Sequence, residues 1–255
     1  MSYLLSVCVP TKNRQRYCAE VLMVLSRFKN ANMEVCVMDN SDTDELVSIV
    51  SNLSDQRVRY CYDASVKSSS RNMSDCLAMA EGDFVCMIGD DDLILPKIFD
   101  LCDFMWKTNS LAGVGSHIPE YIWFDSENRR SCELKIVPPR KCPKYFEIFA
   151  TGISVVEALL RQGVVGYQEF RLPRVYHGVV HRSLIETIRL DDTYFFGLSP
   201  DIFSSVGMAF SVDELVVSED PISVAGACPL STTIAMYKNE HSGAYTDIPH
   251  LIGRE

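Results

Sequence analysis

Apolar runs alternate with amphipathic segments along the first half of the chain, and this alternation predicts strands separated by helices. The apolar runs predict strands at residues 4–9, 34–38, 58–61 and 83–88. The amphipathic segments predict helices at residues 16–30, 43–52, 69–81 and 96–108. Gly82 suits a left-handed cap on the third helix, and Pro96 suits the first turn of the fourth. Such a rhythm predicts an α/β fold with a mostly parallel sheet and helices on both faces.

The second half has a less regular pattern. Apolar runs at 112–116 and 121–124 predict two further strands, which we interpret as a hairpin. Helical spacing returns at 155–162, 183–188 and 200–210. The tail from Cys228 onward is rich in turn-forming residues and suits a lid or a terminal arm.

One stretch of the second half, residues 126–144, is basic and proline-rich. Its cations are Arg129, Arg130, Lys135, Arg140, Lys141 and Lys144. We interpret it as an exposed loop. The functional alternative is contact with a phosphate-bearing acceptor or with an anionic membrane surface.

Composition narrows the class of protein. A chain of 255 residues with 47% hydrophobic content can bury a large core, as one domain or as two fused halves. The net charge of −10 argues against binding to nucleic acid, which requires a basic face. No stretch approaches the roughly 20 apolar residues of a membrane-spanning helix, and the opening segment lacks the basic region of a signal peptide.

The cysteines point to a reducing compartment. The chain has ten, without a CxxC pair, and several of them lie inside apolar strand-like runs. Free cysteine behaves there as a small hydrophobic residue, so we expect a cytoplasmic protein without a disulfide framework. The spacing also gives no support for a zinc site.

Three consecutive carboxylates, Asp90, Asp91 and Asp92, follow the apolar run 84–88. They stand at the carboxyl end of a predicted strand, where open α/β sheets bind ligands. Adjacent negative charges repel one another, so a buried triplet requires a counter-charge. Mg²⁺ or Mn²⁺ would supply it, because both prefer oxygen ligands and are commonly shared with substrate phosphates. The alternative is a solvated acidic turn before the helix that starts at Pro96.

Five short motifs occur in order along residues 4–108. They are Val-Pro-Thr-Lys-Asn-Arg at 9–14, Val-Met-Asp-Asn-Ser-Asp at 37–42, Ser-Arg-Asn at 70–72, Ala-Glu-Gly-Asp at 80–83 and the aspartates at 90–92. Each alone is weak, but their order and spacing resemble the family 2 glycosyltransferases, which have the GT-A fold. The resemblance covers less than half of the chain. It implies a nucleotide-sugar-binding half at 1–115 and an acceptor-binding half at 116–255 of one GT-A domain.

The resemblance also implies roles for individual residues. Pro10 and Thr11 would lie against the nucleobase with Arg14 nearby, and Asp39 would accept a hydrogen bond from the base. Arg71 would pair with phosphate or stack on the base. In the triplet, Asp90 would face the ribose or the metal, and Asp92 would hold the metal. Asp91 would point the other way if this segment is extended, because alternate residues face opposite sides of a strand; the alternative is contact with the sugar. The structural alternatives are a turn-capping role for Asp39 and an ion pair from Arg71 to Asp39 or Asp63.

The chain departs from the family pattern at two points. Many relatives have an aspartate where Gly89 stands, so the division of roles between Asp90 and Asp92 is open. The Asn-Gly step that often precedes the third motif is replaced by Val66-Lys67-Ser68-Ser69.

The implied reaction is transfer of a glycosyl group from a nucleotide-diphosphate sugar to an acceptor hydroxyl, with inversion at the anomeric carbon. A single general base must take the hydroxyl proton. We expect Asp201, in the first turn of an apolar helix, to be that base; the alternative is charge complementarity with the helix N-terminus. Asp191, Asp192 and Asp220 are further candidates. His177 and His181 are candidates for a metal ligand or an acceptor contact rather than for the base.

Other classes fit less well. A nucleotidyltransferase would show a glycine-rich loop after the first strand, and an aspartyl phosphatase would carry its aspartates there. The remaining alternative is a non-catalytic module that binds sugar nucleotides within a polysaccharide assembly complex. By analogy we expect an enzyme at the cytoplasmic face of a bacterial membrane, in peripheral contact with it. Its acceptor would be a glycan or glycolipid of surface polysaccharide synthesis, either O-antigen or capsule.

Overall fold

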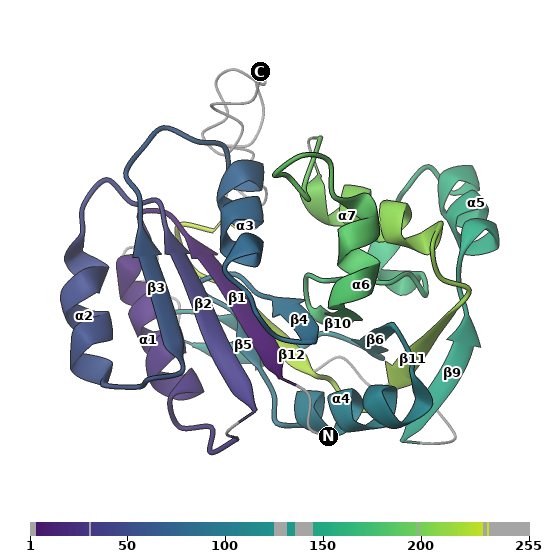
Figure 1. The fold of residues 1–255 in the computed structure, drawn as a ribbon, viewed down its shortest axis with the longest axis horizontal. Helices are drawn as coiled ribbons and strands as arrows, with labels where there is room; N and C mark the ends of the chain where they lie inside the picture. The colour runs from purple at the N-terminus through teal and green to yellow at the C-terminus, as the bar shows by residue number, and fades with distance from the viewer. Residues whose placement is uncertain are drawn as a thin grey trace.

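The computed structural model describes residues 4–30, 32–124, 132–135, 145–197, 199–231 and 234. Its main sheet has eight strands in the order β3-β2-β1-β4-β10-β6-β11-β9 (Figure 1). In chain order these are β1 (Leu5–Thr11), β2 (Met33–Asp39), β3 (Val58–Tyr62), β4 (Phe84–Met87), β6 (Ala112–Gly115), β9 (Phe146–Ala150), β10 (Gly178–His181) and β11 (Glu214–Ser218). Strands from both halves of the chain therefore share one sheet.

A smaller sheet flanks the main one. Its strands, in the order β5-β12-β7-β8, are β5 (Leu93–Ile94), β12 (Ser223–Ala227), β7 (Glu120–Ile122) and β8 (Glu133–Lys135). Because β5 follows the aspartates directly and pairs with β12, a late segment of the chain is brought beside the acidic triplet.

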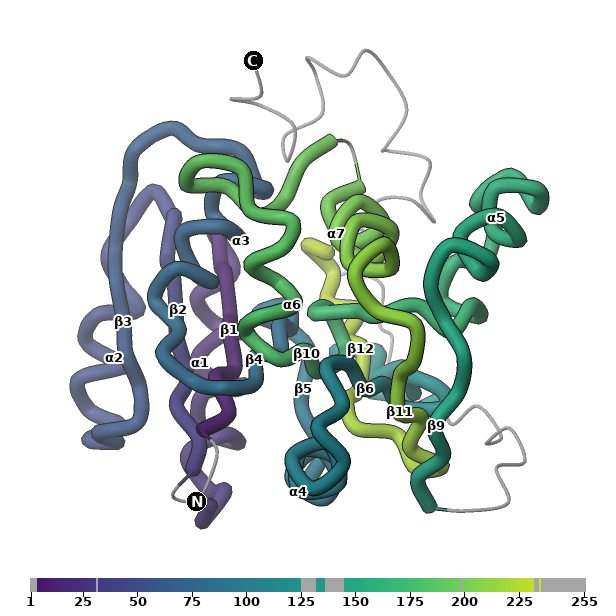
Figure 2. Tube along the Cα trace, turned by 45° about the vertical axis from the view of Figure 1, so that its right-hand side comes forward, coloured from purple at the N-terminus to yellow at the C-terminus, as the bar shows by residue number. Residues whose placement is uncertain are grey.

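Helices cover both faces of the main sheet. They are α1 (Gln15–Leu25), α2 (Glu45–Leu53), α3 (Ser69–Ala78), α4 (Lys97–Thr108), α5 (Ile153–Arg161), α6 (Arg182–Ile185) and α7 (Pro200–Ala209), with short 3-10 turns at Tyr167–Glu169 and Glu186–Ile188. The strands alternate their side chains between two cores. Val7 and Val9 pack with residues of α1 and α4, whereas Cys8 packs on the other face with residues of α3, α6 and α7. Figure 2 shows α2 and α5 at opposite ends of the molecule.

Strand direction positions the site. Strands β3, β2, β1 and β4 are mutually parallel, so their carboxyl ends meet at one edge. β10 is antiparallel to β4, which brings the start of β10 to that same edge. The predicted α/β class with a mostly parallel sheet is confirmed, as are the four early strands to within a few residues and the presence of the four early helices.

Three sequence predictions are wrong. β6 and β7 do not form a hairpin, because β6 pairs with β10 and β11 while β7 pairs with β12 and β8. The helix predicted at 16–30 ends at Leu25. α3 ends at Ala78, and Gly82 lacks a left-handed conformation. Gly82 is needed for space instead, since a Cβ atom there would lie 2.5 Å from the Leu4 carbonyl oxygen.

Parts of other predictions lie outside the described residues. The basic stretch 126–144 is described only at 132–135, and the tail beyond Cys228 only to Ser231 and at Ile234. Within the described part of the chain, the cysteines are free thiols. No helix in that part combines the length and the apolar character needed to cross a membrane.

Candidate active site

The acidic triplet lies in a tight turn at the end of β4, where the Asp92 N–H donates to the Gly89 carbonyl at 3.2 Å. The turn is buried, so the triplet is not a solvated acidic loop. Gly89 is closely packed, because a Cβ atom there would lie 2.9 Å from Asp92 Oδ2 and 3.0 Å from the Tyr176 hydroxyl. A side chain at this position would require Asp92 or Tyr176 to shift.

Asp90 is held by residues from the end of β1. Its Oδ2 atom accepts hydrogen bonds from the Thr11 hydroxyl at 2.5 Å and from Arg14 Nε at 3.1 Å. A second guanidinium nitrogen, Nη2, lies 2.5 Å from Oδ1. Complete burial raises the pKa of Asp90 to about 7, although Arg14 acts in the opposite direction. Arg14 therefore supplies a counter-charge to Asp90 from within the chain.

Asp91 shares that cation but contacts the late segment of the chain. Its Oδ1 lies 3.4 Å from Arg14 Nη1, and its Oδ2 accepts from the Cys228 N–H at 3.0 Å. Burial raises the pKa of this carboxyl as well. Gly226 packs directly below, since a Cβ atom there would lie 1.8 Å from the Asp91 carbonyl oxygen.

Asp92 has a different set of partners. It accepts from the N–H groups of Gly89 and Gly226, both at 2.6 Å, and from the Tyr176 hydroxyl at 2.9 Å. His177 Nε2 lies 3.2 Å from its Oδ2. Burial acts to raise the pKa of Asp92, but His177 and the N–H donors outweigh it and hold the pKa below its usual value. Asp92 is therefore an ionised carboxylate fixed in one orientation.

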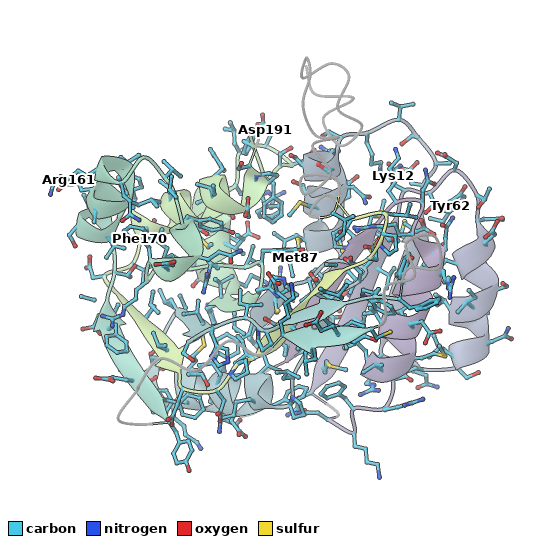
Figure 3. The ribbon with its side chains drawn as sticks, turned by 180° about the vertical axis from the view of Figure 1, so that it is seen from behind. Lys12, Tyr62, Met87, Arg161, Phe170 and Asp191 are labelled. Atoms are coloured by element: carbon cyan, nitrogen blue, oxygen red, sulfur yellow. The ribbon has the colours of Figure 1, made fainter. Side chains whose placement is uncertain are left out.

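The candidate nucleotide-binding residues occupy the same edge. Thr11 and Asp39 are register partners at the ends of β1 and β2. Asp39 is buried and accepts from the Tyr60 hydroxyl at 2.8 Å and from the Ser41 N–H at 2.9 Å, so it also caps a turn. Pro10 is half-buried just before Thr11. Figure 3 shows Lys12 and Tyr62, at the ends of β1 and β3, on the side of the molecule away from Arg161 and Phe170.

Arg71 is less closely tied to this group. Its side chain, 48% exposed, pairs with Asp75 at 2.8 Å one turn along α3. The ion pairs considered for it with Asp39 and Asp63 are not the ones it makes, and Asp63 pairs with Lys67 instead. Its neighbour Asn72 is buried and donates to the Thr11 carbonyl at 3.2 Å, which fixes α3 against the site.

A cavity of about 520 Å³ opens beside Asp92. Polar and charged groups on its wall include Asp92, Glu120, Lys135, Gln168, Tyr176 and His177, and the rest of the lining is mainly aliphatic. Asp90 and Asp91 are not among the lining residues. Of the three aspartates, Asp92 is therefore the one presented to a ligand in this cavity.

Asp201 lies in the first turn of α7, where its carboxylate accepts a hydrogen bond from the Tyr167 hydroxyl. It does not line the cavity, but the residue after Tyr167, Gln168, does. The other carboxylates considered lie elsewhere. Asp191 and Asp192 are exposed beside Arg189, and Asp220 lies 3.6 Å from Lys97.

Sequence reasoning gave no role to the pairing of His177 with Asp92. His177 is buried, and its Nδ1 lies 3.0 Å from the Ser223 hydroxyl on β12. Its φ of 57° is left-handed, which is unusual for a residue other than glycine. Its N–H donates to the Met87 carbonyl at 3.0 Å, which ties it to the end of β4. Strand direction, which the sequence does not reveal, separates it from His181 at the opposite edge.

Comparison with known proteins finds relatives among the glycosyltransferases. The family model described as Glycosyl transferase family 2 matches residues 6–165, more than half of the chain. The abequosyltransferase RfbV of Salmonella typhimurium is 29% identical over 96 residues, covering 36% of this chain and 29% of that protein. The GalNAc(5)-diNAcBac-PP-undecaprenol beta-1,3-glucosyltransferase of Campylobacter jejuni is 33% identical over 108 residues, covering 41% and 34%. The chain thus spans about a third of the length of these relatives.

Solved structures share the fold. The structure of S. aureus TarS 1-349 in complex with UDP-GlcNAc aligns with a TM-score of 0.60 at 18% identity. The alignment covers 88% of this chain and 58% of that one. At this level of identity the likeness establishes a common architecture, the GT-A type predicted from the motifs.

Proposed function

The chain belongs to glycosyl transferase family 2, and we propose that it transfers a sugar from a nucleotide-diphosphate sugar to an acceptor hydroxyl. The observation that carries the proposal is the convergence of Asp39, Arg14 and Asp92 on one sheet edge, beside a cavity that Asp92 lines. Ligands of open α/β sheets bind at this edge.

The nucleotide would lie over the ends of β1 and β2. In this proposal Pro10 and Thr11 contact the base, Asp39 accepts a hydrogen bond from it, and Arg71 reaches a phosphate. The exposure of Arg71 favours such a role, because a guanidinium paired at the surface is free to change partners at little cost. Asp90 and Asp91, both bound by Arg14, would support the floor beneath ribose and sugar.

Mn²⁺ or Mg²⁺ is the cofactor that this proposal implies, and Asp92 fits it better than Asp90 does. Asp92 lines the cavity, whereas Asp90 does not and is held by Thr11 and Arg14. No group of three or more acidic, histidine or cysteine side chains within the described ranges has the geometry of a metal site. A cation held by one or two side chains would have its coordination completed by substrate phosphates. When bound, such a cation would neutralise charge on the departing diphosphate.

The acceptor would approach from the second half of the chain, so that residues 1–115 bind the donor and 116–255 the acceptor. The acceptor hydroxyl would lose its proton to Asp201 while its oxygen attacks the anomeric carbon and the bond to the diphosphate breaks. A single attack of this kind inverts the anomeric centre. Asp201 would have to exchange its hydrogen bond from the Tyr167 hydroxyl for one from the substrate hydroxyl.

Bacterial surface polysaccharide synthesis is the setting we propose, with a glycan or glycolipid acceptor at the cytoplasmic face of the membrane. The name of the Campylobacter relative supports it, since that protein acts on an undecaprenol-linked glycan. A non-catalytic sugar-nucleotide module is the second candidate. What favours it is that each carboxylate of the triplet already has a partner from the chain: Arg14 for Asp90 and Asp91, and His177 for Asp92.

One experiment separates the two candidates. Thermal unfolding is measured with UDP, GDP, dTDP and CMP, each with and without Mn²⁺. Nucleotide sugars that carry the most stabilising nucleotide are then incubated with lipid-linked glycans, and release of the nucleotide is measured. Stabilisation by one nucleotide together with turnover supports the transferase, because a ligand bound by the folded state raises its stability by mass action. Stabilisation without turnover supports the binding module. The absence of both contradicts the proposed function.

A further inference from the structure

The Asp92–His177 pair has the geometry of two neighbouring ligands of one ion. Their facing atoms, Oδ2 and Nε2, are 3.2 Å apart, and both side chains are almost completely buried while lining the same cavity. Ligands at about 2.1 Å from an octahedral ion are about 3 Å apart when adjacent. An ion between them would thus replace their direct contact with little movement of either side chain.

The surroundings of His177 orient it for this task. Its Nδ1 faces the Ser223 hydroxyl at 3.0 Å, and a hydrogen bond from Nδ1–H to that oxygen leaves the lone pair of Nε2 directed at Asp92. Metal-binding histidines commonly use the second ring nitrogen in this way. The left-handed backbone at His177 and its bond to the Met87 carbonyl fix the ring at the end of β4.

Asp92 would also keep its orientation if an ion bound between it and His177. Its remaining partners, the N–H groups of Gly89 and Gly226 and the Tyr176 hydroxyl, would hold the carboxylate after His177 turned from hydrogen-bond partner to co-ligand. The cavity beyond the pair has room for the phosphates and waters that would complete the coordination.

We propose that His177 and Asp92 together bind the divalent cation of the site, and that the imidazole makes it prefer Mn²⁺ to Mg²⁺. The inference rests on the proposed function and assigns a residue outside the aspartate triplet to it. The preference follows from ligand chemistry, because Mg²⁺ favours oxygen ligands whereas transition-metal ions accept imidazole nitrogen. Two oxygen ligands such as Asp90 and Asp92 would give no such preference.

The test compares two histidine-to-asparagine variants. His177→Asn suits the left-handed backbone, because asparagine tolerates that conformation. His181→Asn is the matched control. His181 ends strand β10, which begins directly after His177, and it caps α6 at the opposite edge, a role that asparagine can keep. Binding of Mn²⁺ alone is measured by loss of the free-ion electron paramagnetic resonance signal, with Mg²⁺ as competitor, and thermal unfolding checks that each variant is folded.

We expect His177→Asn to weaken Mn²⁺ binding at least tenfold and to change Mg²⁺ binding much less, so that the preference for Mn²⁺ collapses. His181→Asn should bind both ions as the wild type does, and Ser223→Ala should weaken Mn²⁺ binding through the loss of orientation. Unchanged Mn²⁺ binding in folded His177→Asn overturns the inference. So does an equal loss for both ions, which would make His177 a residue that only positions Asp92. A wild type that transfers sugar without binding Mn²⁺ overturns this inference alone, whereas nucleotide binding and turnover test the proposed function separately.

Discussion

Removing the Arg14 side chain tests whether the chain itself neutralises the acidic triplet. Arg14→Met deletes the guanidinium that lies 2.5 Å from Asp90 and 3.4 Å from Asp91 and leaves an apolar stem of similar length. Asp90 is completely buried and Arg14 is 23% exposed, so the pair is largely shielded from water. Breaking a buried pair by removing one partner typically costs about 3–5 kcal/mol, because the other charge is left uncompensated. We expect a loss near the lower end, about 3 kcal/mol, since Arg14 keeps some contact with solvent and Asp90 can take up a proton.

The assay is urea unfolding at pH 7 followed by circular dichroism. In thermal unfolding of the same variant, a loss of 3 kcal/mol would lower the melting temperature of a protein of this size by roughly 6–12 °C. Arg16→Met is the matched control, because Arg16 lies two residues along, is exposed, and should change stability by less than about 0.5 kcal/mol.

The double variant Arg14→Met/Asp90→Asn separates charge from packing. If the loss arises from an uncompensated carboxylate, the neutral amide should recover part of it, and the double variant should be more stable than Arg14→Met alone. The reasoning is refuted if Arg14→Met costs no more than Arg16→Met. It is refuted as well if the two substitutions destabilise additively, because the two side chains would then be independent.

Three further outcomes are expected. Asp92→Ala should abolish metal-dependent nucleotide binding while thermal unfolding stays cooperative. Calorimetric titration with the stabilising nucleotide measures this binding. Binding equal to that of the wild type would show that Asp92 does not bind the metal. Asp201→Asn should leave donor binding intact and slow transfer by roughly two to four orders of magnitude, measured by nucleotide release, because a general base contributes about that much; unchanged transfer would move the base elsewhere. Glu34 accepts from the Ser6 hydroxyl at 2.5 Å and the Glu81 N–H at 2.6 Å; burial opposes these bonds, but together with Arg59 they hold its pKa below the usual value. Its ionised form therefore stabilises the fold above about pH 4.3, and this contribution is lost as the pH falls through the lowered pKa. The stability advantage of the wild type over Glu34→Gln, measured by urea unfolding at a series of pH values, should therefore shrink on acidification. An advantage that grows on acidification would contradict the assignment.

The first half of the fold could be predicted from sequence because its strands are long, apolar and separated by helices of ordinary length. The second half could not, because its strands are short and pair with partners far along the chain. β7 has three residues and finds its parallel partner β12 about a hundred positions later. Proximity in sequence instead favoured a hairpin with β6. An apolar run does not specify which strand it will pair with, so the local pattern predicts the strand but not its pairing.

Gly82 illustrates the same limit at a single residue. A glycine after a helix suggested a left-handed cap, which is a local property. Its actual role is to let the chain pass against β1, where the Leu4 carbonyl and the Ser6 hydroxyl leave no room for a side chain. The close approach of the chain at Gly82 to β1 depends on tertiary packing. The local sequence therefore shows the glycine but not the packing that requires it.

The acidic triplet shows why the candidate site was predicted only in part. An extended segment would have turned Asp91 away from its neighbours. The chain instead forms a turn, and the three carboxylates meet different sets of partners. Asp90 contacts the end of β1 and Arg14, Asp91 contacts Arg14 and the stretch after β12, and Asp92 contacts β12 and the residues just before β10. One run of identical residues thereby acquires three environments, with the pKa raised at Asp90 and Asp91 and lowered at Asp92. Because two of those segments come from beyond residue 170, the motif in the first half has no fixed chemistry until the second half packs against it. Truncation after residue 115 should therefore leave a nucleotide-binding motif without a working site, even where the sequence resemblance is strongest.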